Sequence, residues 1–167
     1  MAKALLAFLP MVRAVAEPAP LPAGRLAVMG VTPTPFGTGE RIVHLDLHPL
    51  DVMLTAADPV VIDWTNAAAG PPGADAAMTF LIVASSDLDA VPWWIRPAAW
   101  SLRKVFLRRF QAAVRDDPGP YLAQVARYRL ADPNVRPAEA ARLLRLAKVD
   151  AGDREGVIRG DAHRRQP

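Results

Sequence analysis

The stretch from Arg41 to Asn66, RIVHLDLHPLDVMLTAADPVVIDWTN, most constrains the fold, because its apolar runs are too short to build helices. Three β-prone runs cover residues 42–45, 52–54 and 60–62. The turn residues 55–59 favour a hairpin between the last two runs. The candidate functional residues between or beside the runs are two histidines and three of the four acids in this stretch: His44, His48, Asp46, Asp51 and Asp63. We therefore expect a strand-loop-strand frame, with Asp46 and Asp51 on a loop and Asp63 at the exit of a strand.

Beyond residue 75 the apolar residues recur at helical spacing. Helices are expected over residues 76–85, 98–115 and 121–130, and from Pro137 onward. The first is apolar all round and should be buried, with Asp75 as its N-cap, whereas residues 67–74 indicate a loop. In the second helix a stripe should face the domain: Ala99, Leu102, Phe106, Phe110 and Ala113. In the last helix the inward face should carry Ala141, Leu144 and Ala147. Short strands followed by helices predict an α+β fold.

The chain of 167 residues, 51% hydrophobic and 22% charged, is long enough for one domain with its own core. Proline-rich segments interrupt the first forty residues, so we expect a poorly defined segment over residues 1–35. The domain should cover residues 36–149. Residues 150–167 have little apolar content and should form a disordered tail.

The charge balance gives few clues to partners. A net charge of +3 does not predict a nucleic-acid partner, and the absence of cysteine excludes disulfides and thiolate metal sites. No apolar run approaches the roughly 20 residues that span a bilayer, so no membrane partner is expected. A cytoplasmic location is predicted. The alternative is export, because an apolar stretch over residues 4–12 follows Lys3 and precedes a small-x-small pattern at residues 14–16.

The motif His-Leu-Asp-Leu-His-Pro at residues 44–49, followed by Val-Val-Ile-Asp-Trp at residues 60–64, resembles a known catalytic core. It is similar to that of the aminoglycoside phosphotransferase and choline kinase-like family, in which H-G-D-L-H-x-x-N precedes I-D-W. The resemblance covers about residues 36–149. It implies the carboxy-terminal lobe of a protein kinase-like fold, mostly helical with a short catalytic-loop β-hairpin. It also implies ATP- and Mg²⁺-dependent phosphoryl transfer to a hydroxyl group of a small molecule, either aminoglycoside-like or choline-like.

The resemblance assigns a role to each polar residue of the motif. Phosphoryl transfer asks the protein to position an acceptor hydroxyl and to hold magnesium, and carboxylates suit both tasks. Asp46 resembles the catalytic acid that accepts or orients the proton of the acceptor. Asp63 resembles a magnesium ligand, and Asp51, standing where the family usually has Asn, is expected to be a second one. His48 is expected on the cofactor side, supporting Asp46 or a metal-binding acid, and Asp75 resembles a structural acid.

Two residues of the loop region depart from the family pattern. Leu45 replaces the usual glycine, which should stiffen the loop and restrict the approach of an acceptor. Pro71 stands where an acid commonly follows the glycine of the next loop.

The residues upstream of the motif also depart from the family pattern. Only 43 residues precede His44, Lys3 is their single lysine, and Gly37-x-Gly39 has no third glycine. A Gly-rich hairpin and a strand lysine are therefore not evident, and the chain resembles a carboxy-terminal lobe without its partner lobe. Such a lobe should expose an apolar interlobe surface and self-associate. The alternative function is that of a non-catalytic remnant or interaction module that retains the lobe.

Three further groups of residues have structural alternatives. His44 and His48 are four residues apart, but the intervening residues and Pro49 argue against a helical zinc site, so His44 is expected to hold the loop. Basic residues on the 98–115 helix should form a solvated face, with contact to an anionic substrate or nucleic acid as the alternative: Arg103, Lys104, Arg108, Arg109 and Arg115. Three tryptophans should pack in the core or between lobes, or else form an aromatic wall of the acceptor pocket: Trp93, Trp94 and Trp100.

Overall fold

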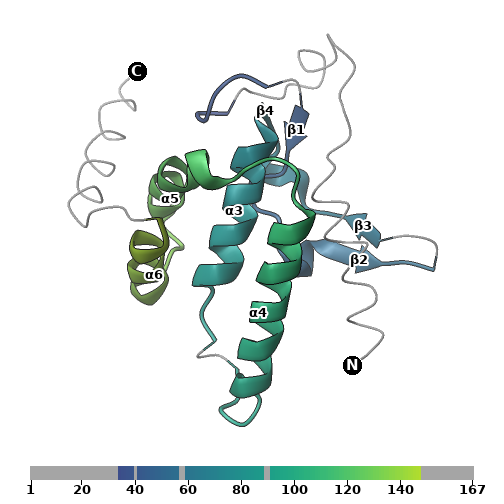
Figure 1. The fold of residues 1–167 in the computed structure, drawn as a ribbon, viewed down its shortest axis with the longest axis vertical. Coiled ribbons are helices and arrows are strands. Elements are labelled where there is room, and N and C mark those ends of the chain that lie inside the picture. The colour runs from purple at the N-terminus through teal and green to yellow at the C-terminus, as the bar shows by residue number, and fades with distance from the viewer. Residues whose placement is uncertain (1–33, 40, 57–58, 89–90, 148–167) are drawn as a thin grey trace.

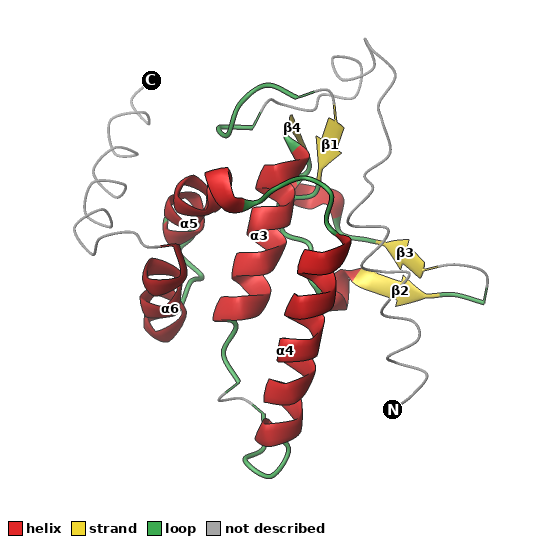
Figure 2. Ribbon diagram, viewed as in Figure 1, coloured by secondary structure: helices red, strands yellow, loops and turns green. Residues whose placement is uncertain are grey.

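The computed structural model describes residues 34–39, 41–56, 59–88 and 91–147. Within these ranges the fold is α+β, as predicted, with four helices and two small antiparallel sheets (Figure 2). The helices are α3 (Pro72–Ser85), α4 (Arg96–Ala113), α5 (Leu122–Leu130) and α6 (Pro137–Ala147). The expected amino-terminal segment lies almost wholly outside the described residues, and the expected tail lies entirely outside them. The domain limits 36–149 stay a prediction.

The predicted hairpin is confirmed. Strand β2 (Val52–Leu54) pairs antiparallel with β3 (Pro59–Val61), and Val52 lies opposite Val61. The hairpin could be predicted because its two signals, short β-prone runs and the turn residues between them, are both local in the sequence.

The predicted loop over residues 67–74 is wrong, because this segment contains strand β4 (Ala68–Gly70) and the first turn of α3. Strand β4 pairs antiparallel with β1 (Arg41–Val43), with Arg41 opposite Gly70. Small side chains let other backbone approach closely: a β-carbon at Gly70 would collide with the Thr34 side chain, and one at Gly39 with the backbone of Gly70. The Thr34 N–H also donates to the Ala69 carbonyl at 2.8 Å. Close packing, rather than β propensity, makes this strand.

Helix α3 forms the centre of the domain, with α4 on one side and α5 and α6 on the other (Figure 1). Helix α3 has neighbours on several sides, so its side chains are buried nearly all round, as their apolar character predicted. Met78 and Leu81 of α3 pack in one core cluster with Val125 of α5 and Leu143 of α6. Ala76 and Val83 pack with Phe106 and Phe110 of α4 in a second.

The predicted inward faces of α4 and α6 need correction. Phe106 and Phe110 are buried, but Leu102 and Ala113 are exposed. The α4 helix turns Arg103 and Leu107 partly inward instead, so the buried stripe is rotated from the predicted one. In α6 the buried residues are Ala140, Leu143 and Ala147; Leu144 is half-buried and Ala141 is exposed. Helical spacing predicted that α4 and α6 are helices, but which side of each helix is buried depends on where α3 lies.

Two arginines from different helices meet the carboxyl end of α3. Arg103 of α4 donates to the Ser86 carbonyl at 2.8 Å, and Arg142 of α6 donates to the Ser85 carbonyl at 2.9 Å. Arg142 also pairs with Asp87 at 3.2 Å. Burial, followed by the nearby charge of Arg142, lowers the pKa of Arg103 from its ordinary value. The predicted solvated role of Arg103 is therefore wrong, since it helps to cap the end of α3.

No helix in the described part of the chain has the length and apolar character needed to cross a membrane.

Candidate functional site

The loop that follows β1 is held on the first turn of α3 by one carboxylate. The Asp75 side chain accepts hydrogen bonds from the backbone N–H groups of His44, at 3.1 Å, and Leu45, at 2.8 Å. The prediction of Asp75 as N-cap is wrong, because α3 begins at Pro72 and Pro71 is its N-cap. Burial raises the pKa of Asp75 above its ordinary value of 3.8, although the two N–H groups and the His44 charge act in the opposite direction. Asp75 thus supports the loop rather than the chemistry.

His44 joins the loop to the end of β3. Its ring is buried, and Nε2 lies 3.0 Å from the Ile62 carbonyl, so this nitrogen carries the proton that is donated. The ring also packs against Trp64, with 4.9 Å between ring centroids. Because Ile62 directly precedes Asp63, His44 fixes the strand exit from which Asp63 projects. This contact agrees with the expectation that His44 holds the loop.

Leu45 and Asp63 both have left-handed backbone conformations, with φ of 60° at each. Such a conformation costs most residues about 1–2 kcal/mol, whereas glycine adopts it freely and Asp tolerates it better than most residues. The Leu45 side chain is buried in the core cluster of α3, which offsets the backbone cost. The loop therefore has the path that a glycine would favour, although leucine occupies the position.

Asp46 projects from the loop and is half-exposed. Its Oδ1 lies 3.2 Å from Nη1 of Arg129, and its Oδ2 accepts a hydrogen bond from Asn66 Nδ2 at 3.2 Å. The same Arg129 donates from Nε to Glu139 at 3.3 Å. Sequence reasoning missed Arg129, Asn66 and Glu139, and it had no signal for Arg129, which lies 83 positions beyond Asp46.

Asp46 lies on the wall of a cavity of about 750 Å³ between the loop and the residues around the end of α5. Its other polar walls include Asn66, Tyr128, Asp132 and Asn134. The volume is that of a site for a small molecule. The carboxylate with the predicted catalytic role is therefore accessible to a ligand.

His48 contacts Asp51 rather than Asp46. His48 Nδ1 lies 2.9 Å from Asp51 Oδ2, and the His48 backbone N–H donates to the same oxygen at 2.9 Å. Asp51 is buried, and its carbonyl accepts from the Ile62 N–H at 2.8 Å. His48 was expected to support Asp46 or a metal-binding acid, and it contacts Asp51, one of the two acids predicted to bind metal.

The register of the hairpin places Asp51 and Asp63 at the same end of it. Asp51 precedes β2, Asp63 follows β3 by two residues, and the hydrogen bond between Ile62 and Asp51 joins these positions. Asp63 is exposed and accepts a hydrogen bond from Thr65 Oγ1 at 2.6 Å. Among the described residues, no group of three or more His, Asp or Glu side chains is arranged to hold a metal ion. Magnesium bound with phosphates commonly uses only one or two carboxylates and water, so the role of Asp51 and Asp63 as its ligands stays a prediction.

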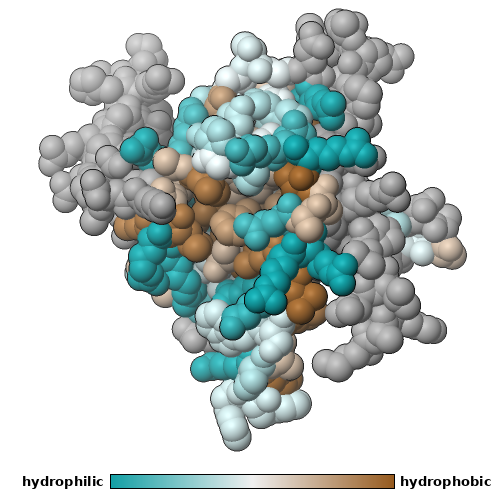
Figure 3. All heavy atoms as spheres, viewed as in Figure 1, coloured by the Kyte–Doolittle hydropathy of each residue, from teal (hydrophilic) through white to brown (hydrophobic). Residues whose placement is uncertain are grey.

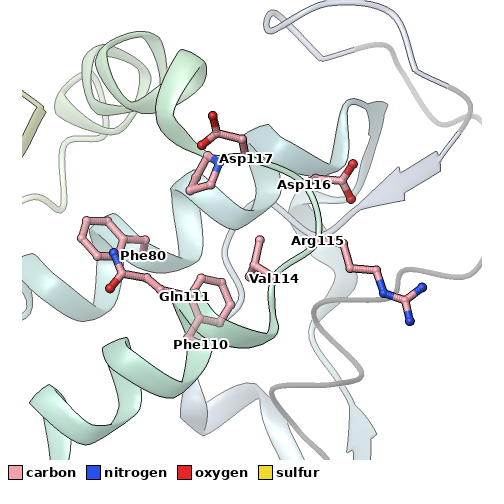
Figure 4. A pocket seen from close by; sticks show the side chains of 8 residues that line it. Phe80, Phe110, Gln111, Val114, Arg115, Asp116 and Asp117 are labelled. Carbon is pink, nitrogen blue, oxygen red and sulfur yellow. The ribbon is translucent and has the colours of Figure 1, made fainter.

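A second cavity, of about 360 Å³, lies between α3 and the carboxyl end of α4 (Figure 4). Phe80 and Phe110 form its apolar side, while Arg115 and Asp116 belong to the loop after α4. None of the residues predicted for the site lines this cavity.

Comparison with known proteins identifies the loop and its surroundings. Residues 25–101, just under half of the chain, match the sequence model of the phosphotransferase enzyme family. The matched stretch contains the whole motif from His44 to Trp64 and continues through Asp75 and α3. This match bears out the predicted resemblance to the aminoglycoside phosphotransferase and choline kinase-like family. This phosphotransferase family supports a kinase-like fold and a kinase-like transfer of phosphoryl groups. Searches of curated proteins and of solved structures gave no match.

Proposed function

We propose that the chain catalyses ATP- and Mg²⁺-dependent transfer of a phosphoryl group to a hydroxyl of a small molecule. The observation that carries this proposal is the position of Asp46, at a cavity of about 750 Å³ on a loop within the segment that matches the phosphotransferase family. The predicted metal-binding acids, Asp51 and Asp63, lie at one end of the adjacent hairpin. A cytoplasmic location, where ATP is abundant, is part of the proposal.

Asp46 is the proposed catalytic residue. Its carboxylate orients the acceptor hydroxyl and takes its proton as the acceptor oxygen bonds to the γ-phosphorus of ATP. The bond between that phosphorus and the β–γ bridging oxygen breaks, and ADP leaves. Arg129 and Asn66 contact one carboxylate oxygen each and so restrict its orientation. A fixed carboxylate supports in-line attack better than a freely rotating one.

Asp51 and Asp63 are the residues that would hold magnesium. Bound there, the ion would neutralise charge on the phosphate oxygens as the transfer proceeds. Asp63 is exposed and offers its carboxylate directly. Asp51 is buried, and His48 occupies one of its oxygens, so we assign His48 the task of orienting Asp51 on the cofactor side. This keeps the predicted role of His48 while specifying the residue through which it acts.

The acceptor cavity favours a molecule that carries both hydroxyl and amino groups. Asp46 and Asp132 contribute carboxylates that both lie within ion-pair distance of Arg129, and Tyr128 contributes an aromatic ring; Arg127 also lines the cavity. Carboxylates pair with ammonium groups, and aromatic rings attract cations at their faces. These features support an aminoglycoside-like or choline-like acceptor.

Calorimetric titration with Mg-ATP tests the proposal. The intact chain should show saturable binding, and Asp63→Ala should weaken it at least about tenfold by removing a metal ligand. Asp116→Ala, an exposed acid outside the site, is the matched control and should bind like the wild type. If the intact chain shows no saturable binding, the kinase proposal fails. A folded chain that does not bind would instead favour the interaction module that retains only the lobe.

A further inference from the structure

The amino-terminal end of α4 and the residues just before it form a projecting end of the molecule, beyond the end of α3 (Figure 1). Trp93 and Trp94 are 78% and 68% exposed there, and Trp100 is about half-exposed. The expectation that these rings pack in the core is therefore wrong. None of the three lines the cavity beside Asp46. Three indole rings facing solvent at one end of a small domain require a functional explanation.

The charge of α4 is entirely positive. The helix contains five basic residues and no acidic residue: Arg96, Arg103, Lys104, Arg108 and Arg109. Arg103 covers part of the Trp100 ring, with its guanidinium carbon 4.0 Å from the ring centroid, and caps α3. Lys104, Arg108 and Arg109 are exposed. The outer side of the helix thus offers cations to an anionic partner.

Aromatic, aliphatic and basic side chains are mixed on this outer side. Trp100, Lys104 and Arg108 follow one another at spacings of four residues, which places them on one face. Leu102 and Val105 of the same helix are also exposed, at 54% and 41%. Figure 3 shows hydrophobic and hydrophilic residues side by side over this lower end of the molecule.

We propose that the outer side of α4, together with Trp93 and Trp94 just before the helix, binds the surface of an anionic phospholipid membrane. Trp side chains are enriched at the boundary between headgroups and acyl chains, where their amphipathic rings are stable. Lys and Arg close to the surface are attracted to anionic headgroups. Trp93 and Trp94 enter the headgroup layer, and Lys104 and Arg108 contact lipid phosphates. The contact is peripheral, so it does not require a spanning helix.

The shape of the surface favours lipid over nucleic acid. Sequence-tolerant binding of a single strand combines stacking rings with a positively charged groove that follows the backbone. The two cavities described above lie elsewhere, and Trp93 and Trp94 belong to the segment just before α4, at a projecting end of the molecule (Figure 1). Exposed Leu102 and Val105 suit acyl chains and offer nothing to a phosphate backbone.

Membrane contact at this end leaves the candidate site open. Asp75 holds the catalytic loop at the first turn of α3, whereas Arg103 joins α4 to the last turn of α3. The 14 residues of α3 separate these ends by about 20 Å. The two functions are therefore independent and can be tested separately.

Vesicle co-sedimentation of the full chain tests the proposal. Vesicles of phosphatidylcholine with an equal amount of phosphatidylglycerol should bind the protein at least about tenfold more strongly than phosphatidylcholine alone, and salt should weaken this binding. The double variant Trp93→Ser/Trp94→Ser and the double variant Lys104→Gln/Arg108→Gln should each reduce binding at least about fivefold. Leu146→Ser, at a partly exposed apolar residue of α6, is the control and should bind like the wild type.

All of these substitutions lie on the surface, and thermal melts should confirm that each variant is folded. Equal sedimentation with neutral and anionic vesicles, or unchanged binding by both double variants, overturns the proposal. A parallel titration with a single-stranded oligonucleotide tests whether nucleic acid is the partner instead. Saturable binding to the oligonucleotide without binding to vesicles would assign the surface to nucleic acid and likewise overturn it.

Discussion

At Leu45 two effects on stability oppose each other. The side chain is buried and stabilises the fold, while the left-handed backbone destabilises any residue other than glycine. Leu45→Ala should lower the free energy of unfolding by about 2–5 kcal/mol, because it leaves a cavity. Leu45→Gly removes the same contacts but relieves the backbone, so it should be about 1 kcal/mol more stable than the Ala variant. Urea unfolding of the two variants checks the order. A Gly variant less stable than the Ala variant would show that the loop is not left-handed here.

Asp75 should make stability depend on pH in a definite direction. Burial raises its pKa in the folded protein, so the folded state keeps a proton that the unfolded state has already released above its ordinary value of 3.8. The stability that Asp75 contributes through this proton is full below pH 3.8 and is lost as the pH rises through the pKa of Asp75 in the folded protein.

The matched variant is Asp75→Asn, which cannot accept hydrogen bonds from both loop N–H groups and should be about 1–3 kcal/mol less stable. The difference in unfolding free energy between wild type and variant should shrink as pH rises above the ordinary value of 3.8 and through the raised pKa of the folded protein. Urea titrations at several pH values measure it. If the difference in unfolding free energy instead grows with pH, the two N–H groups lower the pKa of Asp75 by more than burial raises it.

At the scale of elements, the sequence predicted those helices and strands whose signals come from residues close together in the chain. The β2–β3 hairpin and the four helices follow from local turn residues and spacing. Strand β4 was missed because Ala-Ala-Gly has low β propensity, and its partner β1 lies more than 20 residues earlier in the sequence. The contact between Asp46 and Arg129 was missed for a similar reason, since only the packing of α5 brings these residues together. The acids of the site were found because the family motif is local, while their partners are distant in the sequence.

Helix α3 should depend on the arginines that meet its carboxyl end. Arg142→Ala removes hydrogen bonds to the Ser85 carbonyl and leaves the partly buried Asp87 without this ion pair. We expect a loss of about 1–3 kcal/mol in the free energy of unfolding. Arg145→Ala, at an exposed residue of the same helix, should change it by less than about 0.5 kcal/mol. Unfolding in guanidinium chloride compares the two variants. An equal loss of unfolding free energy in both would indicate that the carbonyls at the end of α3 do not need the Arg142 side chain.

At the scale of the whole molecule, the four-helix core places different surfaces at separate ends. The loop that carries Asp46 is attached to the start of α3, the segment just before α4 lies beyond the other end of α3, and the hairpin extends to one side (Figure 1). The hairpin and the residues next to it expose apolar side chains beside the candidate metal ligands: Leu50, Met53, Val60 and Trp64. A kinase-like fold would cover this side with its other lobe, and the predicted self-association would proceed through the same surface.

The self-association prediction can be tested through a cross-strand pair. Met53 and Val60 lie opposite each other on the hairpin, and both are exposed. The wild type should increase in mass with concentration, because association removes this apolar surface from water. The double variant Met53→Glu/Val60→Lys should remain monomeric, since opposite charges preserve the strand pair while making the surface polar. Sedimentation equilibrium measures both, and Leu146→Ser is a control at a distant apolar residue. If the wild type is monomeric throughout, or if the double variant associates equally, the hairpin is not the contact surface.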